Sequence, residues 1–167
     1  MYEPIRGKSV HTVPAPAAPR ADAARRDQLA EQLAGHLGAL LPHTGVLRRL
    51  TAELLARHDD ADDALAAPLR AQLADLESAE PALTERIAQL APSGHRTRFW
   101  QGTRVPAADA DAPAEIRSLL SLHEQAHALA GRALVSAASR QDTRTAMLAC
   151  RRMDAHSEAL AALGSAP

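Results

Sequence analysis

Leucine and alanine recur at intervals of three and four residues along most of this 167-residue chain, which is the spacing of one face of an α-helix. Four stretches follow this period, over about residues 22–57, 65–90, 113–139 and 142–163. Strands favour aromatic side chains, and these make up only 2% of the residues. We therefore expect an all-α protein of four helices.

Prolines interrupt the helical period. Pro42, followed closely by Gly45, predicts a kink or a break in the first helix, because proline lacks the backbone donor and its ring clashes with the preceding turn. Pro68 and Pro81 predict strain in the second helix for the same reason.

The lengths of the connections predict the topology. Short connections join helix one to helix two and helix three to helix four, so each pair should be antiparallel neighbours. About 22 residues, 91–112, separate helices two and three, which is enough to cross the length of a bundle. Phe99 and Trp100 lie in this segment and indicate that it packs against the helices. We expect a ferritin-like four-helix bundle over residues 22–164, with a long crossover between helices two and three.

The net charge of −1 conceals a basic N-terminus. Residues 1–26 carry a net charge of +3 and four prolines, with few apolar side chains to bury. Residues 1–21 are therefore predicted to form a flexible basic arm. Its positive side chains could bind DNA phosphates without sequence specificity. The candidate DNA-binding residues are Arg6, Lys8, Arg20, Arg25 and Arg26.

Several classes of protein are excluded by simple counts. One cysteine rules out a disulfide framework, and no run reaches the roughly 18 apolar residues of a membrane span. The first residues also lack the apolar stretch of a signal peptide. We expect a cytoplasmic protein that does not enter a membrane.

The third helix carries a string typical of zinc enzymes. Residues 123–127 read His-Glu-Gln-Ala-His, and in HExxH metalloproteases two such histidines bind zinc while the glutamate activates water. His156 or Glu158 would have to supply the third ligand. The chain offers no strands for the sheet beside such a cleft, so a metalloprotease is the less favoured alternative.

A second zinc site uses some of the same residues. His95, His123 and His127, with Trp100, resemble in order and spacing the zinc-binding four-helix domain attached to bacterial chemoreceptors and cyclases. His95 stands where that family has a cysteine, a change that a tetrahedral zinc site permits, and His58 is available as a fourth ligand. A zinc-binding sensor domain is therefore an alternative function.

The last two predicted helices resemble those of the Dps family, the DNA-protecting mini-ferritins. The shared pattern is an Arg-Ala-Leu stretch, an aspartate followed by Thr-Ala, a leucine-rich run, and a histidine before the final leucine. Gln141 stands where the family has a turn glycine, and Ser157 where it has a glutamate. The matching residues are Arg132–Leu134, Asp142, Thr145–Ala146, His156 and Leu163, with weaker matches at His43–Val46 and Thr84–Leu90.

This resemblance implies a hollow dodecamer that oxidises ferrous iron with peroxide, stores the ferric product and protects DNA in the nucleoid. Its iron site would lie at a two-fold interface and use histidines and carboxylates, which are suitable iron ligands. The implied metal ligands are His43, His58, Asp62 and Glu85. Pro81 stands where the family has an aspartate, so we expect an incomplete site with weakened iron oxidation. Twelve copies of the basic arm would form a multivalent DNA anchor.

Overall fold

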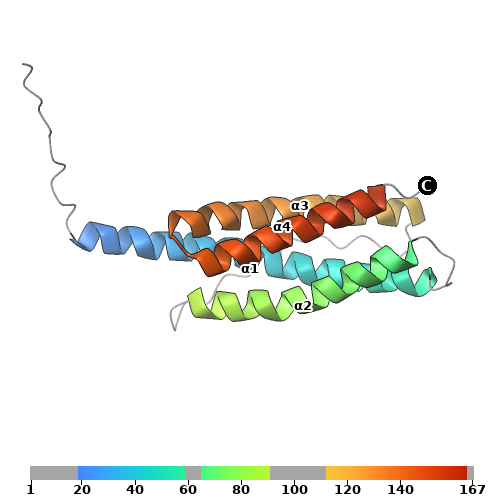
Figure 1. The fold of residues 1–167 in the computed structure, drawn as a ribbon, viewed down its shortest axis with the longest axis horizontal. Helices are drawn as coiled ribbons and strands as arrows, with labels where there is room; N and C mark the ends of the chain where they lie inside the picture. Colours follow the sequence, from blue (N-terminus) through green and yellow to red (C-terminus); the bar gives the residue numbers. More distant parts are fainter. Residues whose placement is uncertain (1–18, 59–64, 91–111, 165–167) are drawn as a thin grey trace, which may run out of the picture.

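Four helices make up almost all of the described structure. The computed structural model describes residues 19–58, 65–90 and 112–164, and no strand occurs in these ranges. The prediction of an all-α four-helix bundle is confirmed, and each helix boundary lies within three residues of the expected position. The helices are α1 (Pro19–Arg57), α2 (Ala66–Leu90), α3 (Ala112–Ser139) and α4 (Thr143–Gly164), shown in Figure 1.

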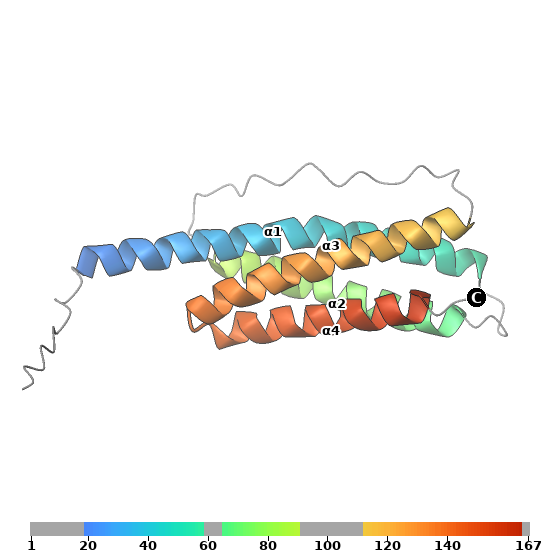
Figure 2. The same ribbon diagram turned by 90° about the horizontal axis from the view of Figure 1, so that it is seen from above.

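The helix directions follow the predicted order. Helices α1 and α4 run one way along the bundle, and α2 and α3 run the other way (Figures 1 and 2). Helix α1 packs against α2 and α3, α3 also packs against α4, and α2 and α4 meet more loosely. Helix α2 ends and α3 begins at opposite ends of the bundle (Figure 2), so the connection between them joins points a bundle length apart. One long connection with this order of directions is the ferritin-like arrangement.

The core consists of leucine and alanine side chains from all four helices. Large leucines of α1 and α2 are fully buried, and they repeat at the helical period expected from the sequence. Four alanines spaced by three and four residues form a fully buried stripe on α3, and Ala149 of α4 is buried with them. These small side chains allow α3 and α4 to approach closely. The stripe consists of Ala126, Ala130, Ala133 and Ala137.

The predicted break at Pro42 does not occur, because α1 is one continuous helix of 39 residues. Proline removes only the backbone donor for the Gly38 carbonyl, four residues earlier. The two side chains after Pro42 bond to the next two carbonyls of the helix. The His43 ring lies 2.9 Å from the Ala39 carbonyl oxygen through Nδ1, and the Thr44 hydroxyl donates to the Leu40 carbonyl at 3.1 Å.

A turn of three residues, 140–142, joins α3 to α4. Gln141 has a φ of 56°, the left-handed conformation that usually selects glycine. The Gln141 N–H donates to the Ala138 carbonyl at 2.9 Å, and the Asp142 N–H donates to the Ala137 carbonyl at 2.9 Å. These are the two bonds of a Schellman C-cap, so the left-handed residue is needed to close α3 before α4 begins.

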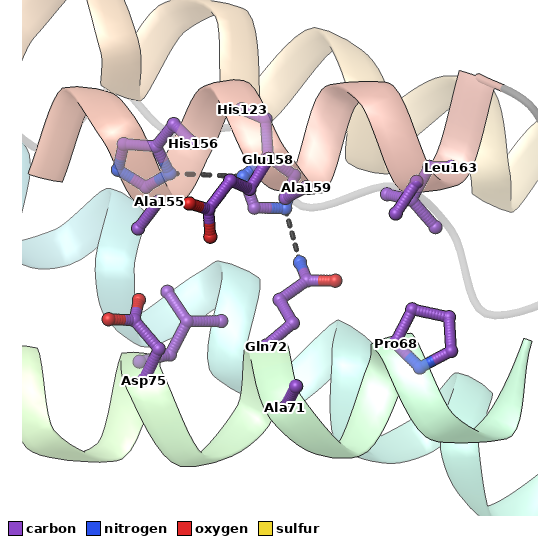
Figure 3. Close-up of a pocket in the computed structure, with 12 residues that line it drawn as sticks. Pro68, Ala71, Gln72, Asp75, His123, Ala155, His156, Glu158, Ala159 and Leu163 are labelled. Carbon is purple, nitrogen blue, oxygen red and sulfur yellow. Dashed lines mark hydrogen bonds between the residues drawn. The ribbon is translucent and has the colours of Figure 1, made fainter.

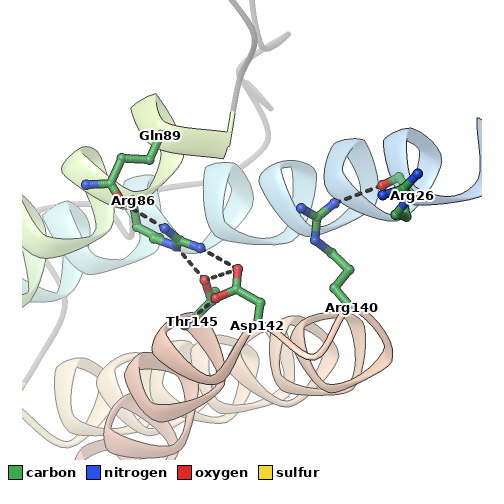
Figure 4. Close-up of polar contacts among 6 residues, drawn as sticks. All are labelled: Arg26, Arg86, Gln89, Arg140, Asp142 and Thr145. Atoms are coloured by element: carbon green, nitrogen blue, oxygen red, sulfur yellow. Dashed lines mark hydrogen bonds and ion pairs between the residues drawn. The ribbon is translucent and has the colours of Figure 1, made fainter. Parts of the chain in front are cut away.

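Asp142 caps α4 and ties this turn to α2 (Figure 4). Its carboxylate accepts hydrogen bonds from the Thr145 N–H at 3.1 Å and the Thr145 hydroxyl at 2.7 Å, and it also pairs with Arg86 of α2. Burial raises the pKa of Asp142, but the hydrogen bonds from Thr145 and Arg86 outweigh it and hold this pKa below its usual value. On the α1 side of the turn, Arg140 donates to the Arg26 carbonyl at 2.8 Å.

Candidate functional site

Two histidines meet in the core between α3 and α4. The Nδ1 atoms of His123 on α3 and His156 on α4 are 3.0 Å apart, and both side chains are only 1% exposed. Their ring centroids are 5.2 Å apart and the rings are tilted by 58°. Each histidine lies on the apolar stripe of its helix, which is why both rings point inward: Leu119 and Ala126 flank His123, and Ala159 follows His156.

Polar residues of α2 face this histidine pair. The side-chain amide of Gln72 contacts Nε2 of His123. Asp75 forms a bidentate ion pair with Arg152 of α4, in which Nη1 of Arg152 lies 3.2 Å from one carboxylate oxygen. Arg152 is 4% exposed, whereas Asp75 reaches the surface. The Nε2 atom of His156 is buried and has no hydrogen-bond partner. The Nε atom of Arg152 is also buried without a partner, and such atoms are costly in a protein core.

The histidine pair borders a cavity of about 210 Å³ between α2 and α4 (Figure 3). The cavity lies where these two helices meet loosely, so it is a gap in packing that the leucine core leaves unfilled. Gln72, His123 and His156 line it, and the carboxylates of Asp75 and Glu158 point into the same gap in Figure 3. Imidazole nitrogens and carboxylate oxygens therefore surround one space large enough for water or an ion.

Both histidines are neutral at pH 7. Burial lowers the pKa of His123 to about 4, and the positive charge of Arg152 acts in the same direction. Burial also lowers the pKa of His156 to about 3, with further contributions from His123 and Arg152. A neutral imidazole has one ring nitrogen with a free electron pair, which is the form that binds metal ions.

His43 of α1 is buried beside α3. It is 5% exposed, and its Nε2 is 3.4 Å from the Gln125 side-chain oxygen, while Nδ1 contacts the Ala39 carbonyl. It is close enough to His156 to be among the groups that lower the pKa of that residue. His43 therefore belongs to the polar interior of the bundle and does not face outward.

The residues of the implied iron site are not brought together within one chain. His43 lies on α1 and His58 directly follows the end of this helix, 15 residues later, which is about 22 Å at 1.5 Å per residue. Glu85 is exposed near the far end of α2, where Gln89 donates to it at 2.7 Å and Arg144 lies 3.6 Å away. Asp62 lies outside the described residues. A metal site that combines these residues would need a second subunit.

The structure describes only part of the predicted zinc-binding set. His95 lies outside the described residues, His123 is buried against His156, and His127 is half-buried one turn further along α3. Glu124 of the HExxH string is exposed, whereas His123 beside it points into the core. In the described ranges, no three His, Cys, Asp or Glu side chains stand close enough together to hold a metal ion in their present positions.

Part of the predicted DNA-binding set lies at the start of α1. Arg25 and Arg26 are exposed on the first turns of this helix, which extend past the ends of the other helices (Figure 2). Arg20 lies in the first turn of α1, which begins at Pro19. Arg6 and Lys8 lie outside the described residues. Within the described ranges, no helix combines the length and the apolar character that a membrane span requires.

Sequence reasoning did not identify Gln72 and Arg152 as partners of the histidines. The sequence does contain an indication of such partners. His123 and His156 occupy positions on the buried apolar stripes of two helices that are joined by a short turn. Polar residues at such positions usually find buried partners. The sequence offers His156 as a match to the Dps pattern and as a zinc ligand for the HExxH string, and the structure places it directly beside His123 of that string.

Comparison with known proteins yields no match to a family model, to a curated protein or to a solved structure.

Proposed function

We propose that this chain is the subunit of a ferritin-like particle that binds ferrous iron and oxidises it, as members of the Dps family do. The observation that carries this proposal is the order of the helices, with α1 and α4 in one direction, α2 and α3 in the other, and one long connection between α2 and α3. The four-residue pattern around Asp142 and Thr145, which carries part of the resemblance, closes the α3–α4 turn and caps α4.

The proposed iron site combines ligands from two chains. His58 lies at the end of α1, and Glu85 lies near the opposite end of the bundle on α2. A partner chain related by a two-fold axis perpendicular to these helices would bring its own Glu85 towards His58. In this arrangement the proposed ligands are His58, Asp62 and Glu85, whereas His43 is buried. Two ferrous ions give one electron each to hydrogen peroxide, the O–O bond breaks, and two protons are taken up to form two waters.

The experiment is ferrous oxidation by the full chain. Metal-free protein receives Fe²⁺ and hydrogen peroxide under anaerobic conditions, and the initial rate of ferric absorbance is compared with that of a protein-free mixture. We expect His58→Ala, Asp62→Ala and Glu85→Gln each to lower the rate at least tenfold. His36→Asn and Glu31→Gln, which change a half-buried histidine and an exposed carboxylate of α1, should leave it unchanged. A wild-type rate no faster than the protein-free mixture would refute the proposal.

Assembly into a dodecamer and DNA binding are further parts of this proposal, with the particle acting in the cytoplasm at the nucleoid. The exposed Arg25 and Arg26 at the projecting start of α1 support it, because they continue the basic arm that contains Arg6, Lys8 and Arg20. Removal of residues 1–20 should abolish a salt-sensitive mobility shift of duplex DNA. Arg49→Ala, an exposed change elsewhere on α1, should not. DNA binding that is unchanged by the deletion would contradict the role of the arm.

A further inference from the structure

The histidine pair in the core has an unsatisfied nitrogen whichever tautomer is present. At 3.0 Å, one Nδ1 donates its proton and the other accepts it, so the two neutral rings share one hydrogen bond. The Nε2 atom of His123 is satisfied by the Gln72 amide, which can present either its nitrogen or its oxygen. The Nε2 atom of His156 remains buried without a partner, either as an N–H or as a free electron pair.

The separation of the two Nδ1 atoms is that of two ligands on one ion. Imidazole nitrogens bind zinc-like ions at about 2.0–2.1 Å, so two of them at angles of about 90–110° are about 2.9–3.4 Å apart. The observed separation of 3.0 Å falls in this range. An ion could therefore replace the shared proton with little movement of α3 relative to α4, if both rings turn so that their Nδ1 electron pairs converge on it.

The cavity beside the pair provides further ligands and access. Of its two carboxylates, Asp75 is held by Arg152 through both oxygens, which leaves Glu158 as the better candidate ligand. Glu158 is exposed at the edge of the cavity, and its carboxylate points into the gap between α2 and α4 (Figure 3). Since no three-ligand set is assembled as the side chains stand, Glu158 must turn towards the histidines when an ion binds.

We propose that His123 and His156 bind one divalent transition-metal ion through their Nδ1 atoms, with Glu158 and water from the cavity as the remaining ligands. Both rings stay neutral and carry their protons on Nε2. The Gln72 amide turns its oxygen to accept the proton of His123, and so becomes the outer partner that orients this ligand. Two imidazoles with one carboxylate suit Fe²⁺ or Zn²⁺. This site lies within one chain and does not depend on the proposed particle or on its shared iron site.

The test is a metal titration of the full chain after removal of metals with a chelator. Co²⁺ serves as the probe, because its visible absorption reports coordination by nitrogen and oxygen. We expect one Co²⁺ per chain, and displacement by Zn²⁺ or by Fe²⁺ in separate anaerobic arms identifies the ion that binds more tightly. His123→Leu and His156→Leu, which keep the core filled, should weaken binding at least 100-fold, and Glu158→Gln about tenfold. The matched control His36→Asn should change nothing.

Histidine nitrogen NMR on the wild-type chain provides a readout that needs no variant and therefore does not depend on how the leucine variants fold. Zn²⁺ should shift the Nδ1 signals of two histidines and leave their Nε2 signals protonated. Three results would overturn the proposal: a folded wild-type chain that gives no Co²⁺ bands, bands that persist in both leucine variants, or bands that disappear in His58→Ala or Glu85→Gln but not in the leucine variants. The last result would place the metal in the shared site instead.

Discussion

Mild acid should destabilise this bundle through the buried pair of His123 and His156. The pKa of His123 is lowered to about 4 and that of His156 to about 3, mainly by burial, whereas an unfolded histidine has a pKa of about 6.5. Below pH 6.5 the unfolded chain therefore binds protons that the folded chain does not. The stabilising contribution is complete above pH 6.5 and is lost as the pH falls towards the folded values of about 4 and about 3.

The size of the effect follows from the two protons. At pH 5, protonation of each histidine stabilises the unfolded chain by about 2 kcal/mol, because one pKa unit corresponds to about 1.36 kcal/mol. Both folded pKa values lie below 5, so the folded chain gains almost nothing. The pair thus lowers the free energy of unfolding by about 4 kcal/mol between pH 7.5 and pH 5. This is a large part of the free energy of unfolding of most domains, which is roughly 5–15 kcal/mol.

Urea denaturation followed by circular dichroism at pH 7.5, 6.5, 5.5 and 5.0 measures this change. The control is the double variant His123→Gln, His156→Gln, in which neither side chain titrates while His36 and the carboxylates still do. The wild type should lose about 4 kcal/mol more than the double variant over this range, and each single variant should remove about half of the difference. Equal losses in the wild type and the double variant would refute the reasoning.

Three further changes test the turn and the core. Gln141→Gly should raise the free energy of unfolding by about 1 kcal/mol, because glycine adopts the left-handed conformation at φ 56° without strain; unfolding at an unchanged urea midpoint would contradict this. Asp142→Ala should lower it by about 2 kcal/mol, since α4 loses its N-cap and Arg86 its partner. Leu83→Ala, at a fully buried position, should cost about 3 kcal/mol, whereas the exposed Val135→Ala should cost less than about 0.5; similar losses at both would rule out the core assignment.

The fold was predictable because helical period and connection length are local properties of a sequence. The leucine spacing located all four helices, and the long interval between residues 90 and 112 predicted that α3 runs in the same direction as α2. Gln141, where the resemblance predicts a turn glycine, adopts the left-handed conformation that glycine favours.

The sequence predicts a kink or a break at Pro42, and the continuous α1 excludes the break. Proline removes one backbone donor, and the 39-residue helix continues without that bond. The His43 and Thr44 side chains bond to the Ala39 and Leu40 carbonyls of the same helix. This use of His43 inside the bundle could not be inferred from its similarity to a metal-binding motif.

The candidate site could not be predicted because it is formed by contacts between residues that are far apart in the sequence. His123 and His156 are 33 residues apart, and their contact requires both helices to turn a polar position towards the same seam. Gln72 and Asp75 reach this seam from α2, whose loose packing against α4 leaves the cavity. Periodicity shows that a histidine is buried, but only the relative rotation of the helices determines which groups it meets.

The mass of the full chain in solution tests most directly whether this bundle is the subunit of a ferritin-like particle. Native mass spectrometry at neutral pH measures it without labels or variants. The proposal predicts a species of about 212 kDa, which is twelve chains of 17.7 kDa each. A stable dimer as the only species would contradict the particle, and a stable monomer would contradict both the particle and the shared iron site.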